Sequence, residues 1–331
     1  MYLLYSLILI LIIILVGYIG AGLLGCHTLF GIIAPYFALG VFIAGFIYRI
    51  VLWARSPVPF HIPTVCGQQR SLPWIRSDNK ESPHTTWGVV SRMALEVLFF
   101  RSLFRNDRAE IRQPQRLLYG GNRWLWLGAM VFHWSLLIIL MRHLRFFIEP
   151  VPGCITFLQD IDGFFQWPLP SFYVTDILIV VALLYLFGRR LLNPQVRHIS
   201  LLSDYFALLL IGSIAVTGIL MRHFYKVDLM EIKRFALGIL AFNPVAPEGI
   251  GTIFYIHLFL VSVLLVYFPF SKLMHAGGVF LSPTRNLMNN SRMVRHVNPW
   301  DYPVKVHTYE EYEDEFRTAM KEAGIPVEKN E

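Results

Sequence analysis

Six stretches of the chain are long and almost purely apolar, and polar or charged segments separate them. The stretches cover about residues 2–25, 33–54, 124–146, 173–192, 200–223 and 252–275. A helix needs roughly 20 apolar residues to cross the hydrocarbon core of a bilayer. In lipid a helix satisfies all of its own backbone hydrogen bonds. The pattern therefore predicts an all-α integral membrane protein with a bundle of six transmembrane helices.

The polar segments divide the chain into four expected parts. Residues 1–54 form two N-terminal transmembrane helices, 55–123 a loop, 124–275 a four-helix bundle and 276–331 a tail. Within the loop, one stretch of helical period reads WGVVSRMALEVLFFRSLF, with apolar side chains on one face and arginines on the other. That pattern favours a helix at the membrane surface. The tail contains a short charged helix at 309–323.

Basic residues predict how the chain is oriented. The 55–123 loop is rich in arginine, and the tail is basic at its start, whereas 147–172 has no lysine or arginine. Because cytoplasmic loops carry an excess of Lys and Arg, the N-terminus, the 55–123 loop and the tail are expected in the cytoplasm. The mixed segment at 222–251 is the one discordant element. We therefore expect a multi-pass protein of the cytoplasmic membrane.

Composition narrows the possible functions. The 331 residues are 55% hydrophobic and only 15% charged, with a mean hydropathy of +0.52. The net charge of +7 lies mostly at the ends of apolar runs, which is typical of membrane proteins and speaks against a nucleic-acid partner. Cys26, Cys66 and Cys154 form no CxxC or CxxCH motif. The chain alone is therefore not expected to carry an iron–sulfur cluster or a c-type haem.

Four histidines stand inside apolar runs. His133 and His143 lie in GAMVFHWSLLIILMRHLRFFIEP, and His257 and His275 in GTIFYIHLFLVSVLLVYFPFSKLMHAGG. A polar ring in hydrocarbon is costly without a partner, so such residues suggest a functional role. Three kinds of partner are open: a haem iron, a proton or substrate path, and a hydrogen bond to a neighbouring helix.

The spacing of the histidines favours haem. His133 and His143 are about 15 Å apart on a straight helix, and His257 and His275 about 27 Å. On antiparallel helices, His143 would meet His257 near the outer side, and His133 would meet His275 near the inner side. Each pair could hold one haem by bis-histidine ligation. The two spacings differ by about 12 Å of helix rise, which a kink at Pro269 could partly absorb.

These spacings resemble those of the respiratory nitrate reductase gamma-subunit family of membrane cytochromes b. Two further stretches, GCHTLFGIIAPYFALGVFIAGFIYRI and SPVPFHIPTVCGQQRSLPW, resemble the M-subunit family of the Dsr membrane complex. The resemblance implies two haems b, ligated by His133 with His275 and by His143 with His257, and a quinone substrate such as menaquinone.

The same resemblance implies partners. It suggests a cytoplasmic iron–sulfur subunit related to heterodisulfide reductase, a multihaem cytochrome c, an iron–sulfur subunit and a second membrane subunit. These would act together in dissimilatory sulfur metabolism, including sulfite reduction. On this interpretation the chain is the electron-transfer subunit of a quinone-linked oxidoreductase complex. The alternative is a haem-free membrane anchor for a soluble redox enzyme.

Other residues have weaker claims to a role. Arg142, His223 and Tyr255 are candidates to border a quinone site, because each is expected close to the outer haem. His223 could equally be an ordinary interfacial residue. The adjacent Cys26 and His27, at the outer end of the first helix, could contact a quinone or a partner, or simply lie at the interface. Cys66 is either a structural thiol or a partner contact.

The pairing generates the first prediction. Replacement of either His143 or His257 by alanine should remove the same b haem, because both residues are expected to ligate one iron at the outer side. A redox titration of each variant, followed at the b-type absorbance band, should lose the same component. If the two variants lost different components, the pairing would be wrong.

Overall fold

Helices make up most of the structure, which is a computed structural model. It describes residues 1–56, 67–104, 108–112, 116–163, 172–247, 249–294 and 306–328. The longer helices are α1 (Tyr2–Gly17), α2 (Ala34–Ala54), α3 (Thr86–Phe99), α5 (Arg123–His143), α6 (Gly153–Asp162), α7 (Val174–Leu192), α9 (Leu202–Ile219), α10 (Leu229–Leu240), α11 (Thr252–Tyr267) and α14 (Tyr309–Glu322).

Short helical turns extend or connect these helices. They are η1 (Tyr18–Leu23), η2 (Leu29–Ile33), α4 (Arg101–Phe104), η3 (Leu144–Phe146), α8 (Pro194–Ile199), η4 (Leu220–Tyr225), η5 (Phe268–Phe270), η6 (Lys272–Met274), α12 (His275–Gly278), η7 (Val279–Leu281) and α13 (Pro283–Asn286). The η1, η2 and η4 turns are π-helical.

Five segments among the described residues have the length and composition of membrane spans. They are Tyr2–Leu23, Leu29–Ala54, Arg123–Phe146, Leu202–Tyr225 and Thr252–Phe270. Together with the family evidence given below, they identify a multi-pass membrane protein. The expected span at 173–192 is also helical, as α7, but it carries Asp176, Arg189 and Arg190 and is not among the five. Six crossings therefore remain a prediction.

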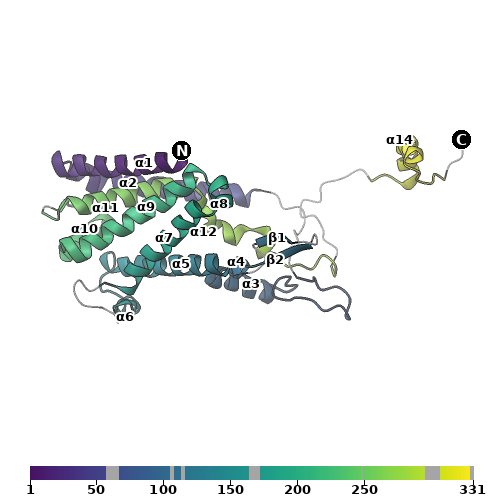
Figure 1. Cartoon of the computed structure of the whole chain (residues 1–331), viewed down its shortest axis with the longest axis horizontal. Coiled ribbons are helices and arrows are strands. Elements are labelled where there is room, and N and C mark those ends of the chain that lie inside the picture. Colours follow the sequence, from purple (N-terminus) through teal and green to yellow (C-terminus); the bar gives the residue numbers. More distant parts are fainter. Residues whose placement is uncertain are drawn as a thin grey trace.

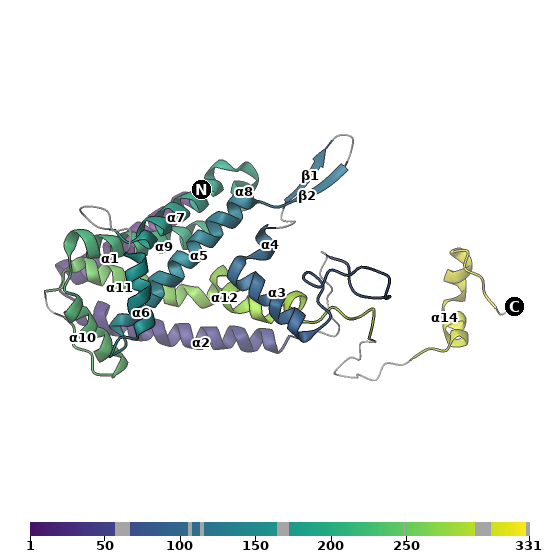
Figure 2. The ribbon, with the colours of Figure 1, turned by 90° about the horizontal axis from the view of Figure 1, so that it is seen from below.

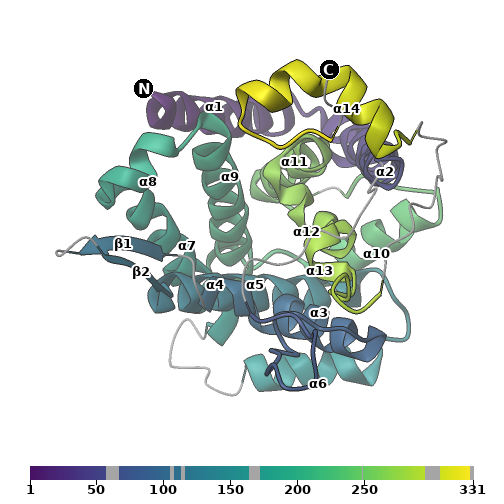
Figure 3. The same ribbon diagram turned by 90° about the vertical axis from the view of Figure 1, so that its right-hand side faces the viewer.

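The long helices run side by side in an elongated bundle (Figure 1). α5 packs on α7, α7 on α9, α9 on α11, and α11 on α2, whereas α1 covers α9. Seen end-on, α5 lies across the bundle from α11 (Figure 3). This order places the two predicted histidine-bearing segments on opposite sides of the bundle interior.

Apolar side chains fill the contacts between neighbouring helices. Ile10 of α1, Phe206 and Leu210 of α9 and Leu260 of α11 form one buried cluster. Phe132 of α5 packs with α7 and α9 in another. Helix α1 turns many leucines and isoleucines outward, which suits a lipid-facing helix. Packing between helices, rather than burial from water, holds such a bundle together in lipid.

The last expected transmembrane helix is broken. The sequence pattern predicts one helix over 252–275, but α11 ends at Tyr267 and His275 begins the separate helix α12. Pro269 cannot donate a backbone hydrogen bond and its ring obstructs the preceding turn. Ser271 is extended, with φ −118° and ψ 176°, and its hydroxyl accepts a hydrogen bond from the Leu273 N–H at 3.2 Å. The break lies at Pro269, where the sequence predicts a kink, and α11 ends before the predicted bound of 275.

The loop between α2 and α5 contains more structure than a surface helix. Thr85 caps α3 by accepting a hydrogen bond from the Gly88 N–H at 3.2 Å, and Phe100 ends α3 at a left-handed φ of 47°. A two-stranded antiparallel sheet follows, formed by Arg108–Arg112 and Arg116–Gly120. This hairpin was not expected, but the fold class remains all-α, because the other elements of the described residues are helical.

The tail ends in α14, which matches the helix expected at 309–323. Thr308 and Glu311 form a reciprocal capping box at its start. α14 lies apart from the membrane bundle (Figures 1 and 2).

A close approach between α2 and the Pro269 turn gives a test of the fold. A Cβ at Gly45 would lie 2.7 Å from the Pro269 Cβ, whereas a Cβ at Gly40 of the same helix meets nothing within 4 Å. Overpacking of this kind costs about 1–3 kcal/mol. We expect Gly45→Val to lower the Tm of the detergent-purified protein and Gly40→Val to leave it unchanged. Equal Tm values for the two variants would contradict this packing.

Candidate functional site

His133 and His275 come together although 142 positions separate them in the sequence. Their ring centroids are 5.9 Å apart and their planes are nearly perpendicular, at 87°. A metal–imidazole bond is about 2 Å long, so two imidazoles on opposite sides of one metal ion have centroids roughly 6 Å apart. The pair therefore has the separation that a single iron with two axial histidines requires.

Hydrogen bonds fix the orientation of three of the rings. The Nδ1 atoms of His133, His143 and His275 lie 2.7, 2.7 and 2.8 Å from the backbone oxygens of Ala129, Ile139 and Lys272. A carbonyl oxygen only accepts, so each Nδ1 carries the proton and donates. Each Nε2 then keeps its lone pair, which is the form that binds a metal.

His257 is held by a neighbouring helix instead of by its own. Its Nδ1 lies 2.9 Å from the Thr217 hydroxyl on α9. That hydroxyl also lies 2.8 Å from the Ser213 carbonyl oxygen and 3.0 Å from the Ile214 carbonyl oxygen, both of which only accept. When its one proton points to these oxygens, the hydroxyl accepts from the His257 Nδ1, and the His257 Nε2 keeps its lone pair. Gly218 lies beside the ring, where an added Cβ would be 3.4 Å from the His257 Cε1.

His143 ends α5 and His257 lies near the start of α11, so the pair is at the opposite end of the bundle from His133 and His275. The donor set is four imidazoles with Nε2 available, two at each end of an apolar bundle. This set fits two bis-histidine haems. Their role as haem ligands remains a prediction.

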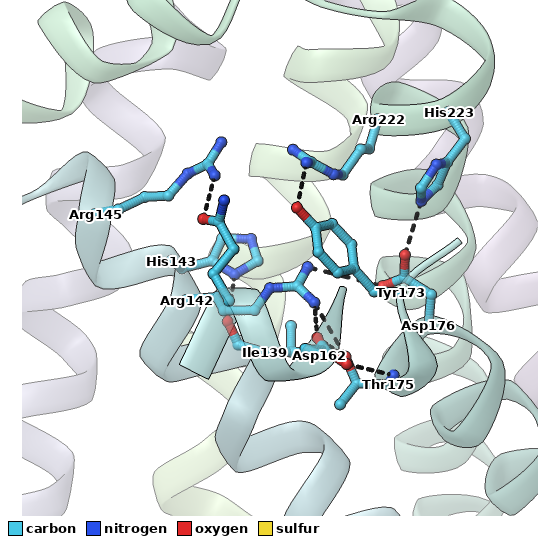
Figure 4. A network of polar contacts seen from close by, with 11 residues as sticks. Ile139, Arg142, His143, Arg145, Asp162, Tyr173, Thr175, Asp176, Arg222 and His223 are labelled. Carbon is cyan, nitrogen blue, oxygen red and sulfur yellow. Dashed lines mark hydrogen bonds and ion pairs between the residues drawn. The ribbon is translucent and has the colours of Figure 1, made fainter. Parts of the chain in front are cut away.

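A polar network surrounds the end of α5 next to His143 (Figure 4). Arg142 forms an ion pair with the buried Asp162 of α6, and its guanidinium lies 3.8 Å from the centroid of the Tyr173 ring. Asp162 also accepts hydrogen bonds from the Thr175 N–H at 2.8 Å and the Thr175 hydroxyl at 2.6 Å. Arg145 donates to Gln159 at 2.7 Å.

The π-helical turn η4 completes this network. Arg222 donates to the Tyr173 hydroxyl at 2.5 Å, and the His223 Nε2 lies 2.7 Å from the Asp176 Oδ2. π-helical turns within α-helices occur frequently at functional sites. A histidine paired with a carboxylate is an effective proton acceptor. Positive charge from the guanidinium groups beside His143 would suit an anionic group such as a haem propionate.

The three candidate quinone-site residues are not all brought together. Arg142 and His223 belong to the same network, because both lie against Asp176, at 3.9 and 2.7 Å. Tyr255 makes other contacts: its ring stacks on His27, with centroids 4.6 Å apart, and its hydroxyl donates to the Pro247 carbonyl at 2.7 Å. The stack gives His27 a specific contact two residues from His257.

The remaining sequence candidates are less informative. The Cys26 thiol is 3.8 Å from the Leu24 carbonyl oxygen. Cys66 lies outside the described residues. Sequence reasoning did not single out Tyr173, Asp176 or Thr217 as site residues. Asp176 carried a signal, because it is a carboxylate within an apolar run, but Tyr173 and Thr217 acquire their roles only from helix packing.

Comparison with known proteins identifies the family to which this chain belongs. Residues 84–297 match the family described as nitrate reductase gamma subunit. The chain belongs to this family. The match includes His133, His143, His257 and His275, and it excludes α1 and α2. The family resemblance expected from the histidine spacings is therefore confirmed.

Individual relatives agree with the family. A cytochrome b-like subunit of an Hdr-like menaquinol oxidoreductase from Archaeoglobus fulgidus is 48% identical over 83% of this chain and 84% of its own length. The corresponding protein of Archaeoglobus profundus is 43% identical over 81% of each chain. The respiratory nitrate reductase 1 gamma chain of Escherichia coli is 28% identical over 37% of this chain and 56% of its own length. The protein is thus similar to quinone-linked membrane electron-transfer subunits.

The hydrogen bond to His257 can be tested by itself. Thr217→Val removes the hydroxyl with little change in shape, whereas Thr217→Ser keeps it. Loss of such a partner typically weakens metal affinity by about 10- to 100-fold. We expect Thr217→Val to speed loss of one haem to excess apomyoglobin by a factor in this range, and Thr217→Ser to behave as wild type. Identical haem loss in both variants would remove Thr217 from the site.

Proposed function

We propose that the chain is a dihaem cytochrome b subunit that exchanges electrons between the membrane menaquinone pool and a cytoplasmic iron–sulfur subunit related to heterodisulfide reductase. The observation that supports this most directly is the 5.9 Å separation of the His133 and His275 rings, each with its Nδ1 tied to the backbone. The relatives named as menaquinol oxidoreductase subunits support the choice of quinone.

Two haems b, when bound, would supply one-electron carriers near the two faces of the membrane. His143 and His257 would hold the outer one, and His133 and His275 the inner one. Neutral imidazole is the ligating form, and the Nδ1 hydrogen bonds keep each ring in the required tautomer. Two histidines for each haem would suit electron transfer rather than oxygen chemistry.

The network around Asp176 would serve the quinone at the outer side. His223 is buried beside Asp176, which would stabilise the imidazolium formed when His223 takes a proton from a quinol hydroxyl. Arg142 would remain tied to Asp162 and the Tyr173 ring, which holds its charge next to His143. This assignment keeps Arg142 and His223 as quinone-site neighbours and gives Tyr255 a supporting position at most.

The inner pair would face the cytoplasmic partner. The Phe100 ring, in the 55–123 loop, lies 4.9 Å from the His133 ring, so this loop is directly beside the inner site. The basic loop and the 276–331 tail would together form the docking surface. We place this complex in dissimilatory sulfur metabolism, with a multihaem cytochrome c and a second membrane subunit as further partners. The N- and C-termini are then cytoplasmic.

A visible difference spectrum tests the proposal. In the purified, haem-replete protein, a soluble menaquinol analogue should reduce b-type bands. In His133→Ala the quinol-responsive component should persist, but electrons should no longer reach the cytoplasmic partner. Loss of that component with the other intact would reverse the inside–outside assignment. A complete lack of b-type bands would instead favour a haem-free membrane anchor.

A further inference from the structure

Helix α3 contacts the element that carries His133. The indole N–H groups of Trp126 and Trp134, both on α5, donate to the carbonyls of Phe99 and Leu98 at 2.7 and 3.1 Å. These carbonyls belong to the last turn of α3, where no intrahelical donor remains for them. The next residue, Phe100, lies against the His133 ring. The C-terminal end of α3 is therefore attached to α5 beside the inner histidine pair.

The same helix also binds the segment that follows His275. Arg92 of α3 is only 6% exposed, and its guanidinium donates to backbone oxygens on two separate stretches of chain. Nε and Nη2 donate to Arg285 at 3.1 and 2.5 Å, Nη2 donates to Leu287 at 3.1 Å, and Nη1 donates to Glu81 at 2.9 Å. The sequence pattern placed the arginines of the stretch 87–104 on a polar outer face, and this expectation is wrong for Arg92.

Only arginine suits this position. Its planar guanidinium offers five donors in a fixed fork, so it can reach several carbonyls at once, whereas a lysine ammonium acts as a compact point charge. Burial lowers the pKa of Arg92, and the neighbouring Glu81 opposes that shift. A charged group so placed is stable only while its acceptors stay in position. Arg92 therefore holds the segment at 285–287 against α3.

The position of His275 depends on such contacts. Because the chain breaks at Pro269, α11 does not rigidly orient α12. On one side, glycines allow α12 to approach α2: a Cβ at Gly277 would be 3.2 Å from both Ile50 Cδ1 and Phe46 Cζ. On the other side, the chain runs through η7 into α13, which packs on α3. α3 and α12 lie at the same end of the bundle (Figure 2).

We propose that Arg92 is a positioning residue for the inner histidine pair. Its guanidinium ties the 275–287 segment to the helix whose end is attached to α5, and so fixes His275 relative to His133. Arg92 touches neither ring and acts only through the backbone that it binds. The inference rests on the proposed function in so far as the pair holds a haem. The mechanical link itself does not depend on the haem.

The test compares Arg92→Met and Arg92→Lys with the control Arg101→Met in the full-length, haem-replete protein. Arg101 is the matched control because it is a second arginine of the same region that binds Glu81, at 2.9 Å, but contacts neither 285 nor 287. The inner and outer redox components are assigned with His133→Ala and His143→Ala. We measure the low-spin electron paramagnetic resonance signal and haem loss to excess apomyoglobin.

In Arg92→Met we expect the inner component alone to change its low-spin signal and to lose haem about 10- to 100-fold faster, as for other residues that support a metal ligand. Arg92→Lys should restore part of the effect, and Arg101→Met should match wild type. Equal changes in both components would show that Arg92 only stabilises the protein as a whole, and an unchanged inner component would also overturn the proposal.

A second measurement does not require haem. Amide hydrogen exchange over 275–287 should rise in Arg92→Met but not in Arg101→Met, because only the former loses the link to that segment. If wild-type protein shows no b-type bands, the proposed function fails. Amide hydrogen exchange then tests, without the haem measurements, whether Arg92 holds the 275–287 segment. Exchange that is unchanged in Arg92→Met would refute the positioning role whatever the spectrum shows.

Discussion

An imidazole in an apolar helix has two ring nitrogens that need a partner. In four histidines of this structure, one of them, Nδ1, is held by a hydrogen bond. Nδ1 donates to a backbone carbonyl in His133, His143 and His275, and it is hydrogen-bonded to the Thr217 hydroxyl in His257. The cost of a polar ring in hydrocarbon is thereby reduced while Nε2 keeps its lone pair. The tautomer, the ring orientation and the direction of each Nε2 follow from that one bond, and so does the suitability of the site for iron.

The break at Pro269 makes the inner pair possible and also leaves it in need of support. A straight helix through 252–275 would carry His275 about 12 Å further along the axis than the spacing of His133 and His143 allows. Ending α11 at Tyr267 removes that mismatch, because α12 takes a new direction and its histidine reaches His133. The same break uncouples His275 from α11, so that α2, α3 and Arg92 must hold it.

At the other end of the bundle, near His143, ion pairs and hydrogen bonds between charged side chains hold the structure together, whereas a helix break shapes the end near His275. Arg142, Arg222 and His223 converge on Tyr173 and on the carboxylates of Asp162 and Asp176. Buried ion pairs are costly to assemble, and replacing them with apolar residues often leaves stability unchanged or improves it. Their presence beside His143 is therefore better explained by a task that needs charge and a proton acceptor than by stability.

Much of this protein can be predicted from local signals in its sequence. Apolar runs of sufficient length predicted the membrane helices, and histidines within them at spacings of 10 and 18 residues predicted both the family and which rings should pair. Those signals are local, because hydropathy and helical rise depend on neighbouring residues alone. Helix packing sets the remaining features: Arg92 is buried, Thr217 is hydrogen-bonded to His257, and Tyr255 stacks on His27. A side chain's partner depends on which helices pack together and how the chain turns between them. Contacts between residues far apart in the sequence leave no local pattern from which they could be predicted.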